Sequence, residues 1–177
     1  MTTIPFFNYP SIYRSYEEEY EVAIKQVLSQ GKFIMQEELF EFEERLKTYL
    51  GVKHAFGVAD GTMALYLSMK ALGIGSGDEV IVPSHTFAAS ASAIAHTGAT
   101  PVLCDSGPDH LIEPTSVKNV ISKKTKAIMP VHLNGRTANM DRILEISKEY
   151  NLLIIEDACQ ALGSSYKKTF AGTFGSA

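Results

Sequence analysis

From residue 53 onward, the sequence alternates between short apolar runs and longer segments with helical periodicity. The short runs are typical of β-strands and cover 53–58, 79–82, 101–104, 126–131 and 152–156. The segments between them show the apolar spacing of amphipathic helices and cover 62–72, 87–97, 114–123 and 138–150. Strands this apolar are typically buried on both faces. We therefore predict an α/β domain with a mainly parallel sheet and flanking helices.

The first fifty residues follow a different pattern. Residues 1–14 hold two prolines and several aromatic residues, and we expect an extended arm there. Helical spacing then covers about 15–30 and 36–50. Each of these two helices is followed by a glycine, Gly31 or Gly51, which is typical of a helix end. Since no linker or repeat divides the remainder, we predict one domain over 15–177.

The end of the chain reads as an interrupted pattern. Residues 169–175 are typical of a turn between two elements, and the last predicted strand has no clear crossover after it. We therefore expect this α/β domain to be truncated and to lack its C-terminal part.

Composition excludes several classes of function. Hydrophobic residues make up 45% and charged residues 20%, and the net charge of −4 comes without a basic cluster that would favour nucleic acid. No apolar run has the length of a membrane span, and the N-terminus does not resemble a secretory signal. Cys104 and Cys159 lie far apart in apolar surroundings, and we expect both to be reduced core residues of a cytoplasmic protein. The five histidines show no metal-ligand spacing, so we predict no metal site.

Polar groups follow three of the predicted strands, and ligands of open parallel sheets bind beyond the carboxyl ends of strands. In the first group, Asp60 is a good helix N-cap, Gly61 allows close backbone approach and Thr62 adds a hydroxyl. The free amides of a helix start favour an anion such as phosphate. The same three residues are also ordinary helix-capping chemistry.

The second and third groups follow later strands. The second is PSHTFAAS, residues 83–90, where Phe87 could be a platform for a planar ring or an ordinary core aromatic. The third is Glu156 and Asp157, of which only one readily faces a cleft because successive strand residues point to opposite faces. Asp157 could hold a cationic ring nitrogen or cap the segment 158–162, and Gln160 could reach the same ligand.

A phosphate cradle, a ring platform and a carboxylate together suit pyridoxal phosphate (PLP). PLP chemistry also needs a lysine that carries the cofactor aldehyde as a Schiff base. Lys167 and Lys168 lie side by side in a polar turn, where we expect them to be solvated. The three polar and aromatic groups therefore favour PLP as the cofactor. Neither Lys167 nor Lys168 is identified as its Schiff-base lysine.

The chain resembles the DegT/StrS-type family of PLP-dependent sugar aminotransferases over nearly its whole length. The resemblance is carried by residues 31–94, by PVHLNG at 130–135 and by IIEDACQALGSSYKKTFAGTFGSA at 154–177. It implies the large domain of a fold-type I PLP enzyme. It also implies a set of cofactor contacts: Gly61 and Thr62 to the phosphate, Phe87 stacked on the ring, Asp157 at the ring nitrogen and Gln160 near the ring hydroxyl. His132 lies in the same family segment without an assigned role.

The resemblance also implies an activity. Family members transfer an amino group, commonly from glutamate, to a keto carbon of a nucleotide-linked sugar, as in polysaccharide biosynthesis, and they work as homodimers. The family's phosphate-binding serine and Schiff-base lysine would lie beyond Ala177, so we expect the 177-residue chain alone to be inactive. Two alternatives stay open: a PLP- or PMP-dependent sugar dehydratase with histidine in place of that lysine, and a non-catalytic cofactor-binding or interaction fragment.

The sequence departs from the family pattern at three positions. Asp60 stands where asparagine or serine is common, Asn134 where tyrosine is common, and Met35 where glycine is common. An acidic side chain next to a phosphate is tolerable only if it caps the helix. We therefore expect Asp60 to act as a cap.

Overall fold

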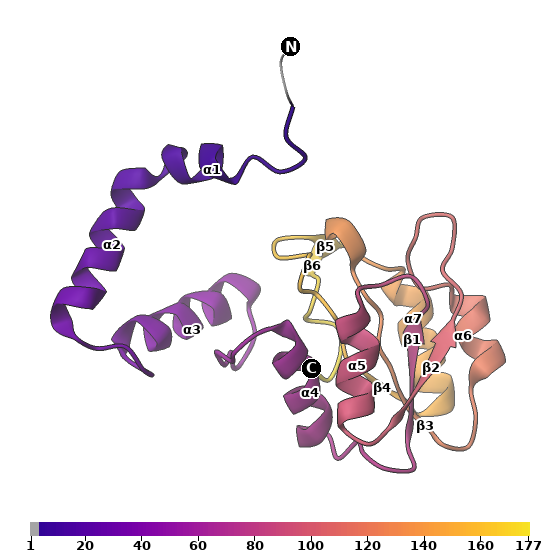
Figure 1. Ribbon diagram of the computed structural model, residues 1–177. Helices are drawn as coiled ribbons and strands as arrows, with labels where there is room; N and C mark the ends of the chain where they lie inside the picture. The colour runs from indigo at the N-terminus through magenta and orange to yellow at the C-terminus, as the bar shows by residue number, and fades with distance from the viewer. Residues whose placement is uncertain (1–3) are drawn as a thin grey trace.

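The computed structural model describes residues 4–177 and contains one parallel sheet at its centre (Figure 1). The strands are β1 (Glu79–Pro83), β2 (Thr100–Cys104), β3 (Thr125–Ile128) and β4 (Leu153–Ile154). Their order in the sheet is β2-β1-β3-β4, and all neighbours are parallel. The predicted parallel α/β sheet is thus confirmed, although β3 and β4 are shorter than the apolar runs 126–131 and 152–156.

Helices cover both faces of this sheet. On one face, α4 (Gly61–Ala71) and α5 (Ala88–His96) pack against Val80 and Val82 of β1. On the other face, α6 (Pro114–Val120) and α7 (Met140–Tyr150) pack against Ile81 and against the ends of β3 and β4. Successive side chains of β1 therefore point alternately into two separate hydrophobic cores, as expected for a strand buried on both faces.

Residues 53–58 do not form the strand that we predicted. They form no ladder with any strand, and Phe56 and Val58 are exposed. A strand needs a neighbour for its backbone groups, and here the Gly57 amide donates instead to the Glu43 carboxylate at 2.6 Å. The outer edge of β4 is occupied by the last residues of the chain, since the Ser176 amide donates to the Ile154 carbonyl.

Two short strands between 165 and 170 were not predicted. β5 (Ser165–Tyr166) and β6 (Thr169–Phe170) form an antiparallel hairpin. Lys167 and Lys168 make its two-residue turn with φ of 49° and 71°, a geometry that suits the twist of a hairpin but is rare for lysine. The sequence contains none of the glycine or asparagine signals that normally mark such a turn.

The N-terminal helices are α1 (Tyr9–Ser15), α2 (Glu17–Gln30) and α3 (Glu37–Leu50). Figure 1 shows them reaching away from the α/β body, and none of them has a buried residue. The two predicted helices are confirmed, and they end at Gly31 and Gly51 with positive φ. The expected extended arm is wrong over α1, where the Asn8 side chain caps the helix and Pro10 lies in its first turn. The part of that arm over residues 1–3 lies outside the described residues.

The short 3-10 helix η1 (Leu133–Gly135) follows β3 and leads toward α7. None of the helices over residues 4–177 is long and apolar enough to cross a membrane.

Candidate functional site

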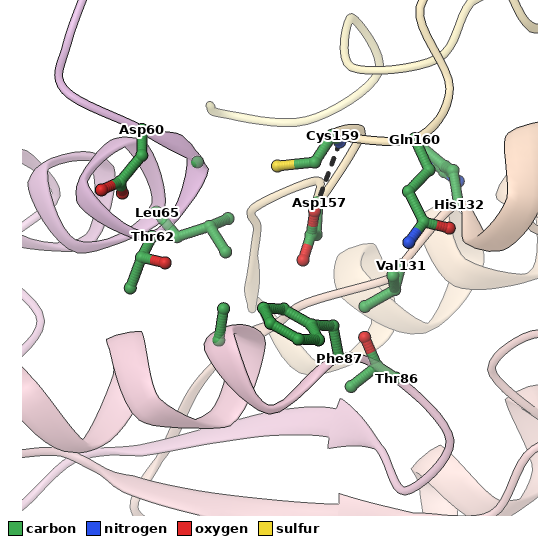
Figure 2. A pocket seen from close by; sticks show the side chains of 12 residues that line it. Asp60, Thr62, Leu65, Thr86, Phe87, Val131, His132, Asp157, Cys159 and Gln160 are labelled. Carbon is green, nitrogen blue, oxygen red and sulfur yellow. Dashed lines mark hydrogen bonds between the residues drawn. The ribbon is translucent and has the colours of Figure 1, made fainter. Parts of the chain in front are cut away.

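One cavity of about 280 Å³ lies beyond the carboxyl ends of the central strands (Figure 2). Four chain segments contribute to it: the start of α4, the loop from β1 to α5, the residues after β3 and the loop after β4. Its lining comprises Asp60, Gly61, Thr62, Leu65, Thr86, Phe87, Ala89, Val131, His132, Asp157, Cys159 and Gln160. All five residues that we predicted as cofactor-binding, spread over a hundred residues of sequence, therefore line one cavity.

The start of α4 presents backbone donors to this cavity. The Asp60 carboxylate accepts the Met63 amide at 2.8 Å, and the Asp60 carbonyl accepts the Ala64 amide at 3.0 Å. Asp60 is thus a helix cap, as expected from its departure from the family pattern. The first amides of a helix, here those of Gly61 and Thr62, have no intrahelical partner and suit an anion.

The absence of a side chain at Gly61 is required by the close approach of Cys159. A Cβ atom on Gly61 would lie 2.4 Å from the Cys159 sulfur, which is far closer than real contacts allow. The close approach brings the loop after β4 against the start of α4. Two of the four segments that line the cavity, the start of α4 and the loop after β4, are therefore in direct contact.

Phe87 is the N-cap residue of α5, and its ring is 73% exposed. The alternative that Phe87 is an ordinary core aromatic is therefore wrong. Figure 2 shows the ring along one wall of the cavity, on the side of Asp157. An exposed aromatic ring beside a carboxylate suits a planar, cationic ligand.

Asp157 is 8% exposed and is fixed from several sides. Its amide donates to the Pro130 carbonyl and its carbonyl accepts the His132 amide, both at 3.0 Å. Its Oδ2 accepts the Ser90 hydroxyl at 2.7 Å, and its Oδ1 accepts the Cys159 amide at 3.3 Å. Residues 158–162 form no helix, so Asp157 does not act as a helix N-cap. Sequence reasoning missed Ser90, although this residue ends the segment 83–90 in which Phe87 was singled out.

Gln160 presents a donor to the cavity. Its Oε1 accepts the Asn134 amide at 2.7 Å, and Asn134 adopts a left-handed φ of 54° that turns this amide toward it. With the oxygen engaged, the Nε2 group is on the cavity side, as Figure 2 shows. The arrangement suits a ligand oxygen.

Glu156 points away from this cavity, as the strand alternation predicts for one of the two carboxylates. Its side chain is fully buried and accepts four hydrogen bonds at 2.6 to 2.8 Å. Three of the donors are the amides of Gly172, Phe174 and Gly175, and the fourth is His132. Glu156 therefore holds the segment after β6 against the end of β4.

His132 is buried and has both ring nitrogens engaged. Its Nδ1 accepts the Ala138 amide at 3.1 Å, so Nε2 carries the proton and donates to Glu156 at 2.8 Å. This fixes a single neutral tautomer. Within residues 4–177, no group of three or more His, Cys, Asp and Glu side chains could hold a metal ion.

Cys104 is buried as expected, but Cys159 is exposed at the cavity, so the core position expected for it is wrong. Its thiol therefore provides a chemical probe of the cavity. Partial burial of the sulfur, followed by the negative charge of Asp157, raises the pKa of this thiol to about 11. At pH 8 we expect iodoacetamide to label Cys159 about 100-fold more slowly than a free cysteine, because little thiolate is present. The rate should rise with pH until about 11.

Cys104 is the internal control for this labelling. It is 3% exposed, and burial raises its pKa to about 12, so it should react only after unfolding in urea. Mass spectrometry of the labelled peptides separates the two sites. Labelling of Cys159 at the rate of free cysteine would contradict the described environment.

Comparison with known proteins identifies a family model and several relatives that match this chain. A model of the DegT/DnrJ/EryC1/StrS aminotransferase family matches residues 14–177. The chain is 47% identical over 150 residues to GDP-perosamine synthase of Caulobacter vibrioides. This match covers 84% of this chain and 39% of that protein.

Two solved structures share the fold closely. The structure of DesV from S. venezuelae superposes with a TM-score of 0.94 and 41% identity, covering 97% of this chain and 47% of DesV. NtdA from Bacillus subtilis with bound cofactor PMP gives a TM-score of 0.90 and 34% identity, covering 97% of this chain and 40% of NtdA. The chain thus spans less than half the length of these three proteins.

Proposed function

This chain belongs to the DegT/DnrJ/EryC1/StrS aminotransferase family, and we propose that it is the N-terminal, cofactor-binding part of a sugar aminotransferase that uses PLP. The observation that carries the proposal is the meeting of Gly61, Phe87 and Asp157 around one cavity. These three residues supply phosphate donors, a ring platform and a carboxylate, and PLP requires all three. A metal or nucleotide site would not need this combination.

Each side chain has a defined task in this proposal. The amides of Gly61 and Thr62 and the Thr62 hydroxyl would bind the phosphate, and Phe87 would stack on the ring. Asp157 would keep a proton on the ring nitrogen, and the Gln160 Nε2 group would donate to the ring oxygen. When bound, PLP supplies an electron sink for the carbon that carries the amino group. His132 and Glu156 would take no part in proton transfer, because both are engaged with each other and with backbone amides.

The lysine of an aminotransferase has to come from elsewhere in the protein. None of the twelve residues that line the cavity is a lysine, and Lys167 pairs with Asp141 outside it. We propose that the lysine lies in the region of the relatives' sequences that this chain does not cover. The 177-residue chain would then bind PLP weakly and lack aminotransferase activity.

We further propose a cytoplasmic homodimer acting on a nucleotide-linked keto sugar with glutamate as amino donor. A second subunit is supported by the many exposed apolar side chains on α1–α3, such as Ile24 at 58% and Phe40 at 51% exposure. The nucleotide-linked substrate is supported by the relatives, of which one is a GDP-perosamine synthase.

The first experiment is to read the encoding gene past codon 177. A serine codon followed closely by a lysine codon supports the aminotransferase, and a histidine codon in place of lysine supports the PLP- or PMP-dependent dehydratase. The full-length product should then form amino sugar from glutamate and a nucleotide-linked keto sugar. A stop codon directly after residue 177 would overturn the enzyme proposal in favour of a non-catalytic chain.

A further inference from the structure

Ser90 makes a side-chain hydrogen bond that links two distant parts of the cavity wall. It lies in the first turn of α5, is fully buried, and donates to Asp157 Oδ2 at 2.7 Å across 67 residues of sequence. Ser90 belongs to α5, which follows β1, and Asp157 follows β4, and β3 separates these two strands in the sheet. The bond therefore does not follow from the pairing of neighbouring strands.

The direction of this hydrogen bond is determined by chemistry. An ionised carboxylate only accepts, so the single hydroxyl proton of Ser90 must be directed at Asp157. The Thr86 hydroxyl lies 3.0 Å from the Ser90 oxygen and must then be the donor of that second bond. The result is a directed chain in which Thr86 donates to Ser90 and Ser90 donates to Asp157.

The same turn of α5 carries the ring platform. Phe87 precedes Ser90 by three residues, and the Ser90 amide donates to the Phe87 carbonyl at 3.1 Å. The Ser90–Asp157 bond thus fixes the carboxylate relative to Phe87. Figure 2 shows the Phe87 ring on the side of Asp157. Each Asp157 oxygen then accepts one hydrogen bond, Oδ2 from Ser90 and Oδ1 from the Cys159 amide at 3.3 Å, and the carboxylate keeps acceptor capacity for a ligand.

From this geometry we infer that Ser90 is a positioning residue, which aims the Asp157 carboxylate at a protonated ring nitrogen of the ligand. The inference rests on the proposed function, because it takes the ligand to be a pyridoxal-type cofactor. It adds a residue that touches neither cofactor nor substrate. Charge-assisted hydrogen bonds of this kind are stronger than neutral ones, so loss of the hydroxyl should have a measurable effect.

The test measures how well the cavity distinguishes two ligands. Pyridoxamine phosphate is used because it needs no lysine, and it is compared with the analogue in which a carbon atom replaces the ring nitrogen. Equilibrium dialysis gives both dissociation constants for the 177-residue wild type, for Ser90→Ala and for Ser90→Thr, with circular dichroism to check folding. We expect wild type and Ser90→Thr to prefer pyridoxamine phosphate. In Ser90→Ala this preference should fall about tenfold while analogue binding stays unchanged.

Each other result has a definite meaning. Equal weakening of both ligands by Ser90→Ala would show a merely structural role and overturn the inference, as would a preference that Ser90→Ala leaves intact. Loss of the preference in a folded Ser90→Thr would show that the hydroxyl is not responsible, which also overturns it. If the wild type binds neither ligand, or binds both equally, the proposed function fails first and the inference fails with it.

Discussion

Replacing Asp157 by asparagine in the full-length enzyme is expected to lower aminotransferase turnover by about 100-fold or more. The asparagine keeps the shape of the side chain and an acceptor for Ser90, so the protein should remain folded. It removes the negative charge that holds a proton on the ring nitrogen inside a largely buried site. Steady-state kinetics with saturating amino donor, together with a thermal unfolding curve, measures both parts of the expectation.

Asp60→Asn is the matched control for this substitution. Asp60 lines the same cavity, but its carboxylate is engaged as the cap of α4, and asparagine caps a helix equally well. We expect this variant to keep most of the activity. Equal losses in both variants would contradict a specific role for Asp157.

Cys159 gives a second readout of the Asp157 charge that needs no cofactor. Since the Asp157 carboxylate is the largest charge that raises the pKa of this thiol, Asp157→Asn should lower that pKa and speed its alkylation at pH 8. Unchanged alkylation would show that the carboxylate does not act on the thiol as the structure indicates.

Replacing Glu156 by alanine is expected to destabilise the folded chain by about 3 kcal/mol or more. The substitution removes the fully buried acceptor of three backbone amides and of the buried His132 ring, and a hydrogen-bonding group left unsatisfied in a buried place is costly. Glu156→Gln keeps one acceptor oxygen and should have a smaller effect. Urea denaturation of the three proteins gives the free energies of unfolding.

Hydrogen exchange tests whether the effect has the expected location. The amides of Gly172, Phe174 and Gly175 should lose protection first in Glu156→Gln, whereas amides of β1 should keep theirs. The control is Glu149→Ala, which breaks the exposed ion pair with Lys118 and should hardly change the urea midpoint. A Glu156→Ala variant as stable as Glu149→Ala would rule out the role that we assign to the buried carboxylate.

Local sequence patterns predicted the elements that depend on local physics. Apolar runs such as 79–82 became buried parallel strands, because alternation and hydrophobicity act within a few residues. Gly31 and Gly51 ended their helices as expected, and the capping chemistry of Asp60 located the start of α4. Since strand ends gather at one edge of a parallel sheet, Phe87 and Asp157 could be placed in one cavity from sequence alone. Gly61 lines the same cavity although the strand predicted before it does not form.

Features that depend on distant partners were decided only by the tertiary structure. Residues 53–58 have the composition of a strand, but they have no neighbouring strand to pair with and remain irregular. The bond between Ser90 and Asp157 spans 67 residues, and the burial of Glu156 among amides of 172–175 depends on how the segment after β6 folds back. The sequence therefore determined that Phe87 and Asp157 reach the cavity, because the ends of β1 and β4 are local features. The packing of separate segments determined which hydrogen bonds hold those groups in place, because such contacts leave no periodic signal in the chain.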